Sequence, residues 1–243
     1  MSIFLVITFL FFVGSIIGWS LELFWRRFFS KNNPEKKWIN PGFLIGPYLP
    51  LYGFCLCILF LLSFINVSFI GNPILQKIVL FMLMAACITI FEYIAGLIFI
   101  KGMKIKLWDY SNCFGNIKGI ICPQYSFYWI LLSGIYYFFI HPKILEWLYW
   151  FTNNISFSFV IGFFYGVFFI DVCVSLNLLN KIRKFAKENK LIVLIESFKQ
   201  DISRMNDEIK SKPNFIFSFK LAKHSLLDSL KKHIERKNEN KSD

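Results

Sequence analysis

Charged residues are missing from long parts of this chain. The charge-free stretches lie between Lys37 and Lys77, between Lys118 and Lys143, and between Glu146 and Asp171, and residues 1–25 hold only Glu22. A helix that crosses a bilayer needs about 20 mostly apolar residues. Inside lipid every backbone group must be bonded within the protein, and runs without polar alternation exclude a membrane β-barrel. The absence of charge therefore predicts membrane-spanning helices.

Motifs of several functional classes are also absent. Nothing matches the G-x-x-x-x-G-K-[ST] loop of nucleotide-binding proteins, the H-E-x-x-H of zinc proteases or the G-x-S-x-G of serine hydrolases. The six cysteines form no C-x-x-C pair, so we expect free thiols and no metal site. We predict no catalytic residue and no cofactor. ATP-driven transport would require a separate ATPase subunit.

The apolar runs that are present predict an all-α, polytopic integral membrane helix bundle with about five transmembrane helices. Residues 1–180 form the predicted transmembrane domain. Its helices are expected near residues 3–25, 46–66, 74–100, 124–140 and 155–180. Aromatic residues make up 20% of the chain, and six of the seven Trp fall near these proposed boundaries, where indole rings are favoured. The lipid bilayer is thus the first predicted partner.

The distribution of Lys and Arg predicts the orientation. Residues 26–46, 101–123 and 181–243 hold 5, 4 and 16 of the 27 basic residues. Because loops rich in Lys and Arg stay in the cytoplasm, we expect a multi-pass protein of the cell membrane with its N-terminus outside and its C-terminus cytoplasmic. Residues 1–25 are interpreted as an uncleaved first helix. The net charge of +12 then reflects topology and attraction to anionic lipid, with no nucleic-acid partner.

The composition changes at Lys181. Residues 181–243 carry 16 basic and 9 acidic side chains and form a predicted basic cytoplasmic helical tail. Apolar residues alternate in steps of four and three, which makes a narrow stripe on a helix. The stripe consists of Leu191, Ile195, Phe198, Ile202, Met205 and Ile209. A second amphipathic segment is expected at 215–236, and the two could pair, lie on the inner leaflet or contact a partner.

Three acids inside the apolar runs are the candidate substrate-binding or ion-binding residues. Glu22 stands four residues before Arg26, the favourable spacing for a helical ion pair. Glu92 and Asp171 have no cation within a helical turn, so each needs a partner elsewhere in the chain. An ionisable group in a membrane segment is costly and marks a functional site unless it is held by other groups. The alternative is that these acids bond Tyr, Ser or backbone groups and fix helix packing.

The segment from Asn40 to Gly53 is rich in Pro and Gly. Pro41, Pro47 and Pro50 lack a backbone donor, so this segment cannot begin as a regular helix. It is either a broken entrance that lines a polar site, or an ordinary loop that places Pro47 or Pro50 in the first turn of the second helix. Asp109, in the later loop, either pairs with Lys104 or Lys106 or caps a local turn.

Several ordered motifs resemble one family. They are Gly18-Trp19 and Glu22, Asn40 with Gly42-Phe43-Leu44, Gly46-Pro47, Pro50, Tyr52-Gly53, Glu92-Tyr93 with Gly96, Leu107-Trp108-Asp109-Tyr110-Ser111, Asn116, Gly119, and Ser126 with Trp129. Across residues 10–180 the chain resembles the ABC-transporter type IV family, also called the CmpB-like permeases. Pro41 and Ile120 depart from the pattern, since a basic residue usually occupies each position.

The resemblance implies a membrane permease or a transport-associated subunit of ABC-transporter type, with no substrate specified. It also implies a separate ATPase as a partner, and a small bundle of this kind is compatible with a homo-oligomer. Two alternatives remain open. The chain could be a non-transporting membrane scaffold or assembly factor, or a membrane-embedded enzyme that modifies lipid with Glu92 and Asp171 as an acid-base pair.

Overall fold

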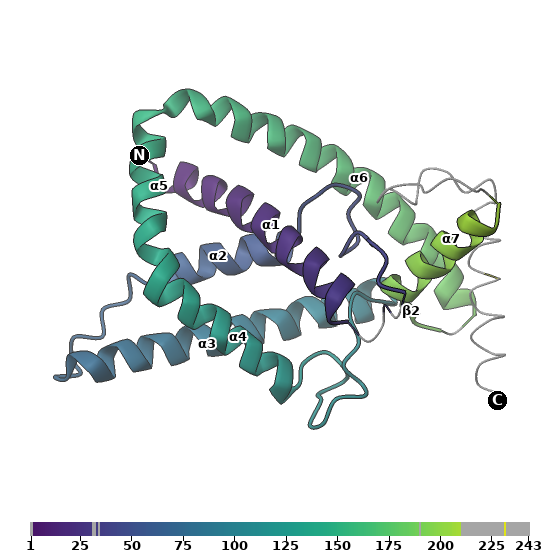
Figure 1. Ribbon diagram of the computed structural model, residues 1–243, viewed down its shortest axis with the longest axis horizontal. Helices are drawn as coiled ribbons and strands as arrows, with labels where there is room; N and C mark the ends of the chain where they lie inside the picture. Colours follow the sequence, from purple (N-terminus) through teal and green to yellow (C-terminus); the bar gives the residue numbers. More distant parts are fainter. Residues whose placement is uncertain (1, 31–32, 34, 190, 210–230, 232–243) are drawn as a thin grey trace. The chain divides into compact units, whose positions relative to one another are not determined.

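The computed structural model describes residues 2–30, 33, 35–189, 191–209 and 231, and the described chain is mainly helical, with very little strand (Figure 1). The helices are α1 (Ile3–Phe28), α2 (Pro50–Leu62), α3 (Pro73–Leu97), α4 (Pro123–Ile135), α5 (His141–Asn153), α6 (Ser158–Glu188) and α7 (Ile195–Ile209). Shorter helical turns are η1 (Ile98–Met103), η2 (Tyr136–Ile140) and η3 (Ile155–Phe157), and two-residue strands are β1 (Ile105–Lys106) and β2 (Val193–Leu194). The predicted all-α fold class is confirmed.

Three helices in the described chain are long and apolar enough to cross a bilayer. They comprise Ile3–Phe28, Pro73–Met103 and Ile155–Glu188, with 26, 31 and 34 residues. Each exceeds the roughly 20 residues that a span requires. The protein is therefore a membrane protein with at least these three candidate spans, and they match the first, third and fifth predicted helices.

The second predicted helix, 46–66, is too long. Helix α2 has 13 residues and begins at Pro50, which lies in its first turn as one interpretation of this loop expected. At its other end Ser63 Oγ donates to the Phe60 carbonyl at 2.6 Å, and Asn66 Oδ1 accepts the Ser68 amide. Polar side chains that bond the nearby backbone favour turns over helix. Prolines at one end and a polar turn at the other thus shorten α2.

The fourth predicted helix, 124–140, is present but does not end where the sequence analysis placed its end. Helix α4 continues through η2 directly into α5, and Figure 1 shows the ribbon changing direction there. Pro142 cannot donate a backbone hydrogen bond, and π-helical turns such as η2 accompany sharp bends. The His-Pro sequence therefore bends the helix instead of ending it. Whether this segment and α2 cross the membrane stays a prediction.

The fifth predicted helix, 155–180, ends too early. Helix α6 runs to Glu188, past the point at which basic residues begin. Ile182, Phe185 and Ala186 in this extension are buried against other apolar side chains, so packing stabilises the additional turns. The onset of charge at Lys181 predicts a boundary between lipid and water, but a helix can continue through such a boundary.

The described chain divides into two compact units, which are treated separately. The helical unit contains residues within Met1–Gly18, Tyr48–Leu97 and Asp109–Phe169, and the loop unit contains residues within Trp19–Pro47, Ile98–Trp108 and Ile170–Asp243. Helices α1 and α6 each contribute to both units.

Glycines allow α1 and α2 to pack closely in the helical unit. A Cβ atom at Gly53 would touch Ser15 Oγ and lie 2.8 Å from the Phe11 carbonyl oxygen, and one at Gly14 would lie 2.9 Å from the Leu56 Cβ. Small residues at such positions let two backbones approach, which is a common way to pack helices in membranes. The Leu49 amide also donates to the Ser15 carbonyl at 2.9 Å, so the start of α2 is fixed to α1.

The loop unit has its own apolar core. Strands β1 and β2 pair in parallel, with Ile105 opposite Val193, although 88 positions separate them in the chain. Around this pair lie buried residues of α6 and α7: Leu179, Ile182, Phe185, Ala186, Ile195, Phe198 and Ile202. Four members of the predicted tail stripe therefore pack within the chain: Ile195, Phe198 and Ile202 are buried, and Leu191 is partly buried against them. The second predicted tail segment, 215–236, lies almost entirely outside the described residues.

Candidate functional site

Asp171 on α6 holds the Gly- and Pro-rich loop by its backbone. Its carboxylate accepts the amides of Ile45 at 3.1 Å and Gly46 at 2.7 Å, and it also accepts the Ser175 hydroxyl at 2.8 Å. Hydrogen bonds from backbone amides to a carboxylate are among the stronger ones in proteins. Asp171 thus has the remote partners that the sequence required, and they are loop amides.

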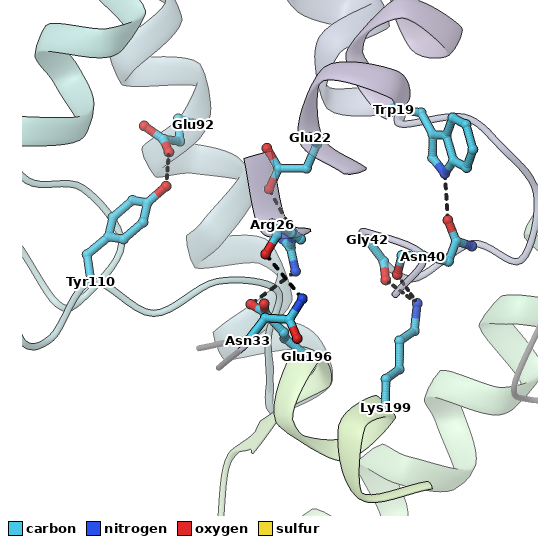
Figure 2. Close-up of polar contacts among 10 residues, drawn as sticks. All are labelled: Trp19, Glu22, Arg26, Asn33, Asn40, Gly42, Glu92, Tyr110, Glu196 and Lys199. Atoms are coloured by element: carbon cyan, nitrogen blue, oxygen red, sulfur yellow. Dashed lines mark hydrogen bonds and ion pairs between the residues drawn. The ribbon is translucent and has the colours of Figure 1, made fainter. Parts of the chain in front are cut away.

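Asn40 organises the same loop from within. Its side-chain oxygen accepts the indole Nε1 of Trp19 at 2.6 Å (Figure 2). Its side-chain nitrogen donates to the carbonyls of Leu44 and Ile45 at 2.9 and 2.8 Å. Gly42 has φ of 73°, a left-handed conformation that glycine adopts without strain. One amide side chain therefore fixes both α1 and the turn that follows.

Lys199 on α7 closes this loop from the other side. Its ammonium donates to the carbonyls of Asn40 at 2.9 Å and Gly42 at 2.8 Å, as Figure 2 shows. Burial, together with the nearby Arg26, lowers the pKa of Lys199 from 10.5 to about 7, although the Glu196 and Asp171 carboxylates act in the opposite direction. The charge on this side chain can therefore change near neutral pH.

A chain of ion pairs connects α1 to α7 in the loop unit. Arg26 Nε lies 2.8 Å from Glu22 Oε1, and Arg26 Nη1 lies 3.1 Å from Glu196 Oε2 (Figure 2). Arg26 and Glu196 are buried, and the Asn33 side chain donates to the Arg26 carbonyl at 3.2 Å. The predicted pair of Glu22 with Arg26 is confirmed, and Glu196 extends it.

Glu92 occupies the helical unit and is bound by aromatic donors. Its carboxylate accepts the Trp129 indole Nε1 at 2.8 Å and the Tyr110 hydroxyl at 3.3 Å. Trp129 lies on α4, so the expectation of a partner on another helix is correct. The Tyr52 ring packs beside Trp129, with 5.4 Å between ring centroids. The hydrogen bond from Tyr110 agrees with the alternative interpretation of the acids, in which they bond Tyr, Ser or backbone groups and fix helix packing.

The loop after Trp108 is ordered by short-range bonds. Asp109 Oδ1 accepts the amide and the hydroxyl of Ser111, so the expected cap of a local turn is observed. The Tyr110 amide donates to the Gly119 carbonyl at 2.9 Å, and its ring stacks on Tyr125 with 4.0 Å between centroids. Ile120, one of the two departures from the family pattern, packs against Gly96.

Comparison of the chain with models of protein families found a family that matches most of its length. The model of the family described as "Putative ABC-transporter type IV" matches residues 9–176. The chain belongs to this ABC-transporter type IV family. Searches of curated proteins and of solved structures found no match.

The type IV family match contains all three candidate acids and the loop from Asn40 to Gly53, but it ends before α7. Lys199 and Glu196, which complete the polar network of the loop unit, therefore lie outside it. Sequence reasoning missed both residues. Helical spacing offered a signal for Lys199, because Ile195, Lys199 and Ile202 fall on one face of α7 and the two isoleucines are buried.

The arrangement in this type IV family member provides hydrogen bonds and ion pairs more readily than metal ligands. Glu22 and Asp171 both lie in the loop unit but bind different groups, and Glu92 belongs to the helical unit. Among the described residues no group of three His, Cys, Asp or Glu side chains is positioned to hold a metal ion. The geometry provides a loop, Asn40 to Gly46, whose amides bind Asp171 and whose carbonyls bind Lys199.

Proposed function

We propose that this chain is the membrane subunit of an ABC-type transport system and works with a separate ATPase subunit. The observation that carries the proposal is the family match over residues 9–176. Three helices suited to a bilayer support it. The lack of a G-x-x-x-x-G-K-[ST] motif supports the assignment of ATP hydrolysis to another chain.

The proposed orientation places the N-terminus outside and the C-terminus in the cytoplasm, with the protein spanning the cell membrane several times. The loop unit contains most of the segments rich in Lys and Arg, including residues 26–46 and the tail, so it would face the cytoplasm. In that position the loop from Asn40 to Gly46 and helix α7 would lie on the same side of the membrane as a cytoplasmic ATPase. The substrate class is left open, as is assembly into a homo-oligomer.

A second candidate is a non-transporting membrane scaffold. The observation that favours it is the bonding of the acids. Asp171 accepts two loop amides, and Glu92 accepts Trp129 and Tyr110, so both carboxylates have partners that fix packing. A scaffold needs such bonds, whereas a transport site must release them to bind its substrate or ion.

Purification of the tagged full-length chain from its native membrane in mild detergent tests the first proposal. Mass spectrometry of the co-purified proteins should identify a nucleotide-hydrolysing subunit in stoichiometric amount, and the complex should hydrolyse ATP. If the chain is recovered only as a homogeneous oligomer, the ABC-type proposal fails.

Two conservative variants separate transport from scaffolding. If the acids take part in transport, Glu92→Gln and Asp171→Asn should accumulate to the normal level but fail to complement a strain in which the gene is deleted. Full complementation by both variants would favour the scaffold.

A further inference from the structure

Arg27 is placed quite differently from its neighbour Arg26. Successive helical residues point about 100° apart, so two adjacent arginines at the end of α1 face different surroundings. Arg26 is buried and pairs with Glu22 and Glu196. Arg27 stacks instead on aromatic rings, with its guanidinium carbon 4.2 Å from the Trp38 ring centroid and 5.6 Å from that of Phe28.

No carboxylate within the described residues neutralises Arg27. Its Nε is covered by protein and has no hydrogen-bond acceptor in the described part of the chain. The acid nearest in the following loop, Glu35, pairs with Lys37 at 2.8 Å. Stacking on Trp38 fixes the plane of the guanidinium, so its terminal amino groups can bind an acceptor that lies outside the described residues.

The surface beside Arg27 is apolar. Leu21, Phe24 and Phe28 follow one another at helical spacing on α1 and are each 50–55% exposed. The Phe24 ring lies against Trp38, with 5.5 Å between centroids. Exposed apolar side chains on a helix that is suited to a bilayer are expected to contact acyl chains. The apolar stripe therefore leads directly to a stacked cation that no acid among the described residues neutralises.

A phosphate group above an acyl chain matches this combination. Arginine binds phosphate through paired N–H donors, and Trp favours the interface where headgroups lie. The end of α1 carries Arg26 and Arg27, and basic helix ends face the leaflet that holds anionic lipids. A free phosphate would match Arg27 but would make no use of Phe24 or Phe28.

We propose that Arg27, stacked on Trp38, binds the phosphate of an anionic phospholipid whose acyl chains lie along Leu21, Phe24 and Phe28. Arg26 supplies the internal ion pairs of the loop unit, and Arg27 supplies its contact with lipid. The site is independent of any transport activity.

Native mass spectrometry of the full-length protein in detergent tests the site. The protein is titrated with short-chain phosphatidylglycerol and, separately, with phosphatidylcholine, and the ratio of the two apparent affinities is the readout. The wild-type chain should prefer phosphatidylglycerol, and Arg27→Gln should reduce that preference by about tenfold or more. Lys184→Gln is the matched control. It removes one exposed charge from α6 and should reduce the preference by no more than about fivefold.

Two further variants distinguish a built site from general attraction. Arg27→Lys keeps the charge but loses the planar guanidinium, and Trp38→Leu removes the ring on which it stacks. Both should weaken the preference measurably while circular dichroism shows normal helix content. If both retain the wild-type preference, the proposal is wrong, and this remains decisive even if Arg27→Gln fails to accumulate. Displacement of phosphatidylglycerol by excess inorganic phosphate would also overturn the lipid assignment.

Discussion

The two units of this protein satisfy buried polar groups in different ways. In the helical unit, Glu92 accepts hydrogen bonds from the neutral side chains of Trp129 and Tyr110, and close packing at glycines joins α1 to α2. In the loop unit, Arg26 links two carboxylates, and Lys199 binds loop carbonyls. Regular helices bond their own backbone, whereas an irregular loop needs side chains to do so. Charge is therefore concentrated where the backbone is irregular.

Replacement of Arg26 should produce the largest effect, because it breaks the ion pairs of the loop unit. Arg26→Met leaves Glu22 and Glu196 without their shared guanidinium and should lower the free energy of unfolding by about 3 kcal/mol. This loss is at the lower end of the range expected when a buried ion pair is broken, because the Glu22 side chain is 22% exposed. Titration with SDS in mixed micelles, followed by circular dichroism, measures it. The triple variant with Glu22→Gln and Glu196→Gln should recover part of the loss; no recovery would contradict the ion-pair account.

Removal of the Asp171 carboxylate tests the attachment of the loop. Asp171→Ala leaves the amides of Ile45 and Gly46 without their acceptor and should destabilise the protein by about 2.5 kcal/mol. Ser175→Ala, which removes only one donor to the same carboxylate, should have a smaller effect. Chymotrypsin should cleave the Asp171→Ala variant near Phe43 faster than the wild type. Equal cleavage rates would show that Asp171 does not hold this loop.

The stability of the helical unit should depend more on side-chain volume at the contact between α1 and α2 than on charge. Gly53→Ala places a methyl group against Ser15 and the Phe11 carbonyl, so we expect a loss of about 2 kcal/mol in unfolding free energy. Gly162→Ala on α6 is the matched control, since nothing lies within 4 Å of its Cβ position. Because Ala favours helix over Gly, the control should be neutral or stabilising. A destabilised control would mean that the close approach of α1 and α2 is not the cause.

The neutral donors to Glu92 can be tested singly. Trp129→Phe keeps a ring beside Tyr52 but removes the indole donor, and it should lower the free energy of unfolding by about 1.5 kcal/mol. Trp147→Phe, on the exposed side of α5, should change it by less than about 0.5 kcal/mol. Equal changes in the free energy of unfolding for the two variants would show that the indole hydrogen bond to Glu92 does not stabilise the protein.

The buried Lys199 predicts a pH dependence that belongs to the loop unit. Its pKa is about 7 in the folded protein and near 10.5 in the unfolded chain, so the unfolded chain binds more protons between these values. The free energy of unfolding should therefore rise with pH from about 7 to about 10, by about 1.4 kcal/mol per pH unit at most, and stay constant below that window. The difference between the wild type and Lys199→Met across this range isolates the effect. A difference that does not vary with pH would contradict it.

Local relations could be predicted from the sequence, and remote ones could not. The pair of Glu22 with Arg26 follows from a spacing of four residues, and the turn at Asp109 follows from its nearest neighbours. The donors to Asp171 are 125 and 126 residues away and are backbone amides, which no side-chain pattern reveals. The onset of charge at Lys181 predicted a membrane boundary but gave no information about where α6 ends, because helix continuation depends on packing of Ile182 and Phe185.

Synthesis of the chain imposes a delay on the loop from Asn40 to Gly46. Asp171, which binds its amides, and Lys199, which binds its carbonyls 159 residues after Asn40, are both made long after the loop itself. At about 5–20 residues per second, Lys199 is added roughly 8 to 32 s after Asn40. Before Asp171 and Lys199 are added, the loop lacks the hydrogen bonds that these two side chains supply, although it can already form its internal bonds and the bond from Trp19. Nascent chains that end before α7 should therefore expose this segment to proteases or to insertion factors, while the first helices are already in the bilayer.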